Sequence, residues 1–240
     1  MMDKLHLDQH ISQQYNADLE DLRTELLEMG GMVEEQVRDA ITAISNADGE
    51  LAERVLVVED EVDQREIALD EHCTLILARR QPAASDLRMV MAVSKITRDL
   101  ERMGDEAQKV ARMAIALVED GSGSQGYVEL RHLGNSVQTM VHQMLDAFAR
   151  FDVETAMNVA KEDKQVDREY RSATRELMTY MMEDPRSISR VMNVMWALRS
   201  LERIGDHARN IAEHIIYLVK GLDVRHTSMK EIEKQLRERP

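Results

Sequence analysis

The sequence carries the hexapeptide Leu-Glu-Arg-Met-Gly-Asp at residues 100–105 and, 101 positions later, Leu-Glu-Arg-Ile-Gly-Asp at residues 201–206. When the comparison is extended over residues 100–118 and 201–219, ten of nineteen positions are identical. Self-similarity of this kind is the mark of a structural unit that occurs more than once. The sequence therefore predicts two copies of one unit in tandem.

Apolar residues recur at alternating steps of three and four in both copies, which is the period of helices packed in bundles. The clearest stripe consists of Val93, Ile96, Leu100, Met103, Ala107, Val110, Ala114 and Leu117. Pro82 and Pro185 interrupt the chain before the last helical stretch of each copy. We therefore predict an all-α fold in which each unit is helix, helix, helix, in the same order.

The boundary between the two units is predicted at residues 121–126, the only stretch rich in Gly and Ser, because such composition favours a flexible connection. The first three-helix bundle is then expected at residues 1–120 and the second at residues 127–221. Gly221 is a natural helix stop. Residues 222–240 are predicted to form a polar C-terminal tail.

Composition narrows the classes of function. Thirty-one Lys and Arg against 45 Asp and Glu give a net charge of −14, which repels nucleic-acid backbones and anionic membranes. The single cysteine, Cys73, permits no intramolecular disulfide and is predicted to be a buried thiol. No apolar run approaches the roughly 20 residues that span a bilayer, and the N-terminus lacks a signal-peptide pattern. We expect a cytoplasmic protein with no transmembrane segment and no direct nucleic-acid partner.

The carboxylates of the repeated hexapeptides are the candidate metal ligands. Helical geometry places Glu101 and Asp105 one turn apart on a face turned away from the core of their own unit. Hard oxygen ligands at this spacing can share a divalent or trivalent cation. The second unit repeats the pair, and the second helices of both units carry the nearest acidic residues that could complete a shell: Glu202, Asp206, Asp63 and Asp167.

The alternative is a solvated acidic face, because the chain has 45 acidic residues and arginines lie close to the candidate ligands. Those arginines are Arg98, Arg102, Arg199 and Arg203. Duplication favours a site, since the Glu-Arg-x-Gly-Asp string occurs in both halves while Glu106 is replaced by His207. Spacing alone leaves both interpretations open.

Asp163 falls between Val159 and Val166 on a predicted core stripe, and a buried carboxylate needs a partner. That partner is expected within the bundle, with metal ligation as the alternative. Gly104 and Gly205 stand inside strong helices at a cost of about 1 kcal/mol each relative to Ala, so we expect a neighbouring helix to approach closely there. For the pair at residues 30–31, a local bend and a contact remain equally open.

No motif argues for an enzyme. The histidines form no His-x-x-x-His or Cys/His cluster of the zinc type. Glu129 and His132 make the only Glu-x-x-His, whereas a ferritin-like di-iron centre needs two. Phosphate-binding Gly-rich loops and the nucleophile elbow of hydrolases are missing from the sequence. We therefore expect no catalytic residues.

The two hexapeptides, together with residues 79–88 and 178–184, resemble the PhoU family in its proteobacterial form. The resemblance extends to residues 29–34 and 217–221 and so covers nearly the whole chain. It implies two antiparallel three-helix bundles with pseudo-twofold symmetry, assembled as a homodimer.

The resemblance also implies a function. A protein of this kind would be a non-enzymatic negative regulator that, when phosphate is plentiful, keeps the phosphate-starvation (Pho) regulon off. It would do so as an adaptor between the Pst phosphate transporter, through its ATPase PstB, and the sensor histidine kinase PhoR. Contact, and no catalytic turnover, would carry the signal.

Metal binding through Glu/Asp-x-x-x-Asp motifs, including iron clusters, is implied in the same way, and these motifs fall on Glu101, Asp105, Glu202 and Asp206. The candidate ions are iron, magnesium, manganese, zinc and nickel. As a hypothesis, metal or partner binding at the carboxylate faces fixes the relative geometry of the bundles and so presents or hides a docking surface. The alternative is a metal-independent helical adaptor or oligomerisation protein.

Overall fold

A computed structural model of the chain describes residues 13–121, 128–225 and 227–238. Its long helices are α1 (Gln13–Asn46), α2 (Gly49–Arg80), α3 (Ala84–Glu119), α4 (Val128–Arg150), α5 (Val153–Glu183) and α6 (Ile188–Lys220). A 3-10 turn, η2 (Pro185–Ser187), precedes α6, and a short helix, α7 (Met229–Glu238), follows it. The described residues contain no strand.

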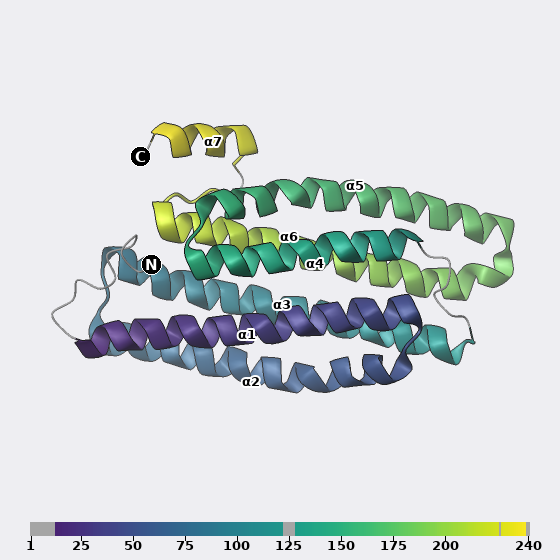
Figure 1. Cartoon of the computed structure of the whole chain (residues 1–240), viewed down its shortest axis with the longest axis horizontal. Helices are drawn as coiled ribbons and strands as arrows, with labels where there is room; N and C mark the ends of the chain where they lie inside the picture. Colours follow the sequence, from purple (N-terminus) through teal and green to yellow (C-terminus); the bar gives the residue numbers. More distant parts are fainter. Residues whose placement is uncertain (1–12, 122–127, 226, 239–240) are drawn as a thin grey trace.

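The six long helices form two three-helix units that lie side by side (Figure 1). Within each unit every helix contacts the other two, and the units meet where α3 packs along α6 and α1 packs on α4. The predicted all-α fold with a repeated three-helix unit is confirmed. The Gly/Ser-rich boundary predicted at residues 121–126 falls, except for Gly121, outside the described residues.

One continuous apolar core runs through both units. All eight residues of the predicted α3 stripe, from Val93 to Leu117, are buried in it. Cys73 is also buried, as predicted, and burial raises the pKa of its thiol to about 12. Among the described helices, none combines the length and the apolar character that crossing a membrane requires.

Helix ends follow the local chemistry of the chain in both repeats. Asp48 caps α2 by accepting a hydrogen bond from the Leu51 amide at 3.0 Å, and Asp152 caps α5 in the same way. Gly221 ends α6 with a φ of 67°, and its amide donates to the Tyr217 carbonyl at 2.8 Å. The predicted stop at Gly221 is therefore a left-handed helix cap.

The C-terminal segment is more structured than its polar composition suggests. Residues 229–238 form α7, which lies beyond α5 in Figure 1. Leu222, Val224 and Ile232 are buried, and Lys161 of α5 is paired with Glu233 at 2.6 Å. Met229, Ile232 and Leu236 stand at the spacing i, i+3, i+7 of one helix face, a short periodic signal inside the segment predicted as a polar tail.

Candidate functional site

The structure brings the acidic residues of α2 and α3 together. The first acidic cluster consists of Glu59 and Asp63 of α2 with Glu101 and Asp105 of α3. Burial, followed by the charges of Glu66, Asp105 and Asp63, raises the pKa of Glu101. Three of these four residues are predicted ligands, and the fourth, Glu59, was missed by the sequence analysis.

Glu59 is the most buried member of the first acidic cluster, at 5% exposed. Gln36 of α1 donates its amide N–H to one Glu59 oxygen, while the other oxygen, Oε1, has no hydrogen-bond partner among the described residues. Burial raises the pKa of Glu59 to about 7, and the neighbouring carboxylates add to this rise. When Asp63 is aligned with Asp167, Glu59 falls at the position of Asp163. The repeat therefore indicates a buried carboxylate at residue 59, as it does at residue 163.

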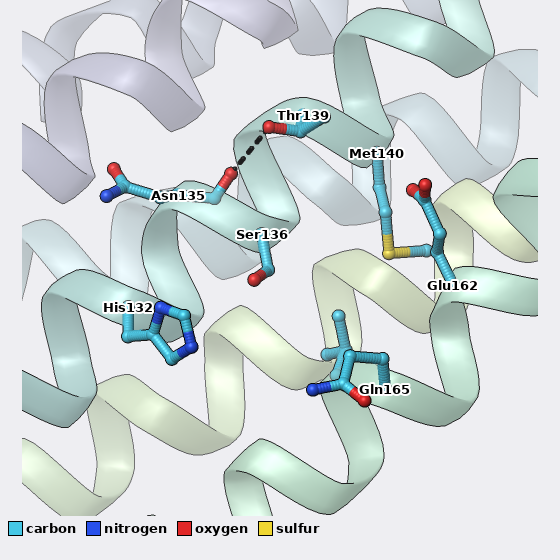
Figure 2. A pocket seen from close by; sticks show the side chains of 8 residues that line it. His132, Asn135, Ser136, Thr139, Met140, Glu162 and Gln165 are labelled. Carbon is cyan, nitrogen blue, oxygen red and sulfur yellow. Dashed lines mark hydrogen bonds between the residues drawn. The ribbon is translucent and has the colours of Figure 1, made fainter.

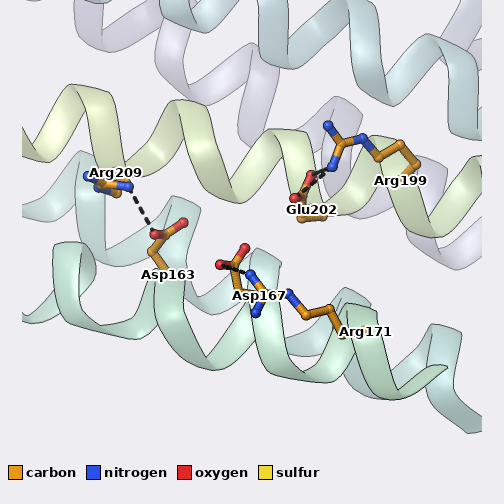
Figure 3. Close-up of polar contacts among 6 residues, drawn as sticks. All are labelled: Asp163, Asp167, Arg171, Arg199, Glu202 and Arg209. Carbon is orange, nitrogen blue, oxygen red and sulfur yellow. Dashed lines mark hydrogen bonds and ion pairs between the residues drawn. The ribbon is translucent and has the colours of Figure 1, made fainter. Parts of the chain in front are cut away.

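The second acidic cluster is the equivalent set on α5 and α6, namely Asp163, Asp167, Glu202 and Asp206. Three of its carboxylates are paired with arginines, as Figure 3 shows: Asp163 with Arg209 at 3.3 Å, Asp167 with Arg171 at 3.1 Å and Glu202 with Arg199 at 2.8 Å. The negative charge of this cluster is therefore largely balanced within the protein.

Asp163 is buried, as its place on the core stripe predicted. Burial raises its pKa to about 6, and the guanidinium of Arg209 acts against this rise. Arg209 also donates to Glu213 of its own helix at 3.1 Å. The partner that sequence analysis expected within the bundle is thus an arginine on α6.

The acidic faces are less open than the sequence indicated. They were expected to turn away from the core of each unit, yet Glu202 is only 8% exposed and Glu101 is half-buried. The reason is that these residues face the second helix of their own unit, where Asp63 and Asp167 add like charge. In residues 13–121, 128–225 and 227–238, no three His, Cys, Asp or Glu side chains are placed so that they could hold a metal ion.

The donor chemistry still distinguishes the clusters. The first offers carboxylate oxygens, one of them buried without a hydrogen-bond partner, and hard cations prefer such ligands. Within the described residues, the one ion pair of the first cluster is the long contact of 3.9 Å between Lys109 and Asp105. In the second cluster, three of the four carboxylates are already paired with arginines. Side chains of the first cluster therefore fit a cation better than those of the second.

Both hexapeptide glycines permit the close helix approach that was predicted. A Cβ at Gly104 would lie 3.0 Å from Gln36 Oε1 and 3.1 Å from Glu59 Oε2, and one at Gly205 would lie 3.3 Å from Val166 Cγ1. Gly104 thus leaves room for the buried pair of Gln36 and Glu59 against α3. Glycine lowers the helix propensity of α3 at position 104, which is the point where Glu59 of the first acidic cluster packs against this helix.

Glu59 should make the stability of the metal-free protein depend on pH. Its pKa is about 7 when folded against an ordinary 4.5, so its stabilising contribution is complete below pH 4.5 and is lost as the pH rises through 7. We expect Glu59→Gln, measured by urea unfolding in chelator-treated protein, to gain stability relative to wild type across this window. A difference that stays constant from pH 4.5 to 8 would contradict the assignment.

A buried polar cluster joins the two repeats where α3 meets α6. Asp99 of α3 accepts hydrogen bonds from His207 Nδ1 at 2.8 Å and Asn210 at 3.3 Å, and His214 Nε2 lies 3.6 Å away. Burial alone would raise the pKa of Asp99, but these donors hold it at about 2. The histidines were expected to have no catalytic role, and their contact with Asp99 could not be predicted, because the sequence of one helix does not show which distant helix it faces.

A groove of about 340 Å³ lies between α4 and α5 (Figure 2). His132 of the lone Glu-x-x-His motif lines it, and its Nε2 atom lies 3.7 Å from Glu169 of α5. Ser136 donates a hydrogen bond to the same carboxylate at 3.0 Å. The lining mixes hydroxyl, amide and apolar groups and gathers no charge of one sign.

Comparison with known proteins agrees with the repeated architecture. The family model described as PhoU domain matches residues 26–114 and again residues 130–215. The phosphate-specific transport system accessory protein PhoU homolog of Pseudomonas aeruginosa is 62% identical over 234 residues, covering 96% of this chain and 97% of that protein. PhoU of Escherichia coli is 49% identical over 235 residues, covering 98% and 97%.

Solved structures agree as well. The crystal structure of PhoU from Pseudomonas aeruginosa has a TM-score of 0.85 at 62% identity and covers 87% of this chain and 100% of that one. The phosphate transport system regulatory protein PhoU from Streptococcus pneumoniae has a TM-score of 0.79 at 29% identity, covering 87% and 98%. With the family model matched in both repeats, this chain belongs to the PhoU family.

Proposed function

We propose that this protein regulates phosphate transport and phosphate signalling by contact with partner proteins, without catalytic turnover. The observation that carries the proposal is the match to the PhoU domain in both repeats, with relatives named as accessory proteins of phosphate-specific transport. In this proposal the protein works in the cytoplasm as a homodimer. It links the transporter ATPase PstB to the sensor kinase PhoR and holds the Pho regulon off when phosphate is plentiful.

Metal binding at the first acidic cluster is the second part of the proposal. A hard divalent or trivalent cation would supply the positive charge that Glu59, Asp63, Glu101 and Asp105 lack. The hexapeptide carboxylates stand on α3, the helix that also packs along α6. A cation bound to these carboxylates would therefore act on the helix that joins the repeats. This supports the proposal that metal binding positions a docking surface.

A metal-independent adaptor is the second candidate, and one observation favours it. Arginines already balance most of the second acidic cluster, as an adaptor with a purely structural acidic face would require. The two candidates differ in whether the purified protein carries metal.

Elemental analysis of protein purified without chelator or added metal separates them. We expect wild type to retain metal, Glu101→Ala/Asp105→Ala to fall to background, and the matched Glu202→Ala/Asp206→Ala variant to keep most of it. The reason is that Glu202 is paired with Arg199, whereas neither Glu101 nor Asp105 forms an ion pair with an arginine within the described residues. Circular dichroism controls for folding. Metal-free wild type would leave the contact-only adaptor as the function.

A further inference from the structure

A cavity of about 380 Å³ lies between α3 and α6, apart from the groove in Figure 2. Four cationic side chains line it: Lys95, Arg98 and Arg102 from α3, and Arg225 from the segment after α6, which is paired with Asp223. The three α3 residues follow the spacing i, i+3, i+7 and so share one face over two turns. In a chain with a net charge of −14, this is a local concentration of positive charge.

The two carboxylates that line the same cavity are engaged by other groups. Asp99 accepts hydrogen bonds from His207 and Asn210, at 2.8 and 3.3 Å. Glu213 is paired with Arg209 at 3.1 Å. Within the described residues, neither carboxylate forms an ion pair with Lys95, Arg98 or Arg102, and the lining holds four cationic side chains against two anionic ones.

Arg98 and Arg102 have guanidinium groups open to a ligand. In the part of the chain that the structure describes, neither lies within ion-pair distance, 4.0 Å, of a carboxylate. Both side chains are exposed, and the acidic residues that interact with them at longer range are Glu66 and Glu101. Such unpaired guanidinium groups suit an anion that enters from solution.

The repeat supplies an internal comparison. A second cavity of about 380 Å³ between the same helices is lined by the residues 101 positions further on, Trp196, Arg199 and Arg203. There Arg199 is paired with Glu202 at 2.8 Å and Arg203 with Glu106 at 2.7 Å. The arginines of the second cavity are thus paired with carboxylates, whereas, within the described residues, the equivalent arginines of the first cavity are not. Trp196 stands in the second cavity at the position equivalent to Lys95.

We propose that the cavity of Lys95, Arg98 and Arg102 binds the phosphoryl group of a small phosphate-bearing molecule. A guanidinium group can donate to two oxygens of a phosphate at once, and the ammonium of lysine adds a mobile charge. The cavity is large enough for inorganic phosphate with its water or for the phosphate chain of a nucleotide. The lining of this cavity shares no residue with the two acidic clusters.

Thermal unfolding of the full-length protein in phosphate-free buffer tests the site. We expect a saturable rise in Tm on titration with inorganic phosphate or ATP, because a ligand of the folded state stabilises it by mass action. Saturation by inorganic phosphate identifies free phosphate as the ligand, and saturation by ATP alone identifies a nucleotide. Sodium sulfate at matched ionic strength is the comparison. An equal response to sulfate, or no saturable response to either phosphate compound, overturns the proposal.

Matched variants assign the response to the cavity. Arg98→Gln/Arg102→Gln should fold normally, since neither side chain is buried or paired, and should lower affinity by about tenfold or more per arginine. Arg199→Gln/Arg203→Gln, in the neutralised cavity, should keep the response. Arg112→Gln, on α3 outside both cavities, is a second control that breaks no ion pair. If the Arg98 and Arg102 variant responds like wild type, or Arg112→Gln also loses the response, the site is refuted.

Discussion

Replacement of Asp99 by alanine is expected to lower the free energy of unfolding by about 3–5 kcal/mol, the cost typical of breaking a buried charged cluster by removing one partner. Asp99 is buried where α3 meets α6, and its oxygens face His207, Asn210 and His214. Removal of the carboxylate leaves these α6 donors without their acceptor in a site that water reaches poorly. Urea unfolding at neutral pH measures the loss.

Two comparisons separate the charge of Asp99 from its shape. Asp99→Asn keeps the volume and one acceptor oxygen, so it should cost less than alanine. The folded pKa of about 2 lies below the ordinary 3.8, so the stabilisation is complete above pH 3.8 and disappears as the pH falls through 2. The difference in stability between wild type and Asp99→Ala should shrink in that acidic window. Equal stability of the two proteins at pH 7 would show that the cluster contributes nothing to the repeat contact.

Periodicity and turn chemistry were sufficient to predict the fold. The α3 stripe, the breaks at Pro82 and Pro185 and the stop at Gly221 all depend on a residue and its near neighbours, and such local rules can be read along one chain. The helix α7 was not predicted, because its three apolar residues at helical spacing, Met229, Ile232 and Leu236, lie in a segment that is otherwise charged and polar. Local sequence does not record which surface a short helix covers.

From the sequence, the candidate site could be predicted only where the spacing of residues along one helix determines it. The spacing of Glu101 and Asp105 placed both on one face of α3, and the structure agrees in bringing Asp63 near them. Spacing along one helix does not decide whether a carboxylate pairs with an arginine, because the same i, i+3 spacing gives an ion pair in one repeat and none among the described residues of the other. The repeats share nearly the same hexapeptide, yet Arg199 is paired with Glu202 while Arg98 forms no such pair within the described residues.

The contact of α1 with α4 leads to the second large prediction. A Cβ at Gly30 would lie 2.5 Å from Leu145 Cδ2, and one at Gly134 would lie 2.8 Å from Ile41 Cγ2. Residues 134 and 145 stand 104 positions after 30 and 41. The two contacts therefore join equivalent positions of the repeats, and in each one a glycine of one repeat makes room for an aliphatic side chain of the other. Of the two interpretations left open for residues 30–31, the structure thus supports a contact at Gly30.

Leucine at these gaps should force the repeats apart. We expect Gly30→Leu and Gly134→Leu each to cost about 1–3 kcal/mol through overpacking, and the double variant to lose more than either one. Gly31 has nothing within 4 Å of the position of a Cβ, so Gly31→Leu is a matched control that should gain up to about 1 kcal/mol in helix propensity. Urea unfolding compares the four proteins with wild type. If Gly134→Leu proves as stable as Gly31→Leu, α1 and α4 do not pack as closely as described, and the geometry between the repeats must be set by α3 and α6 alone.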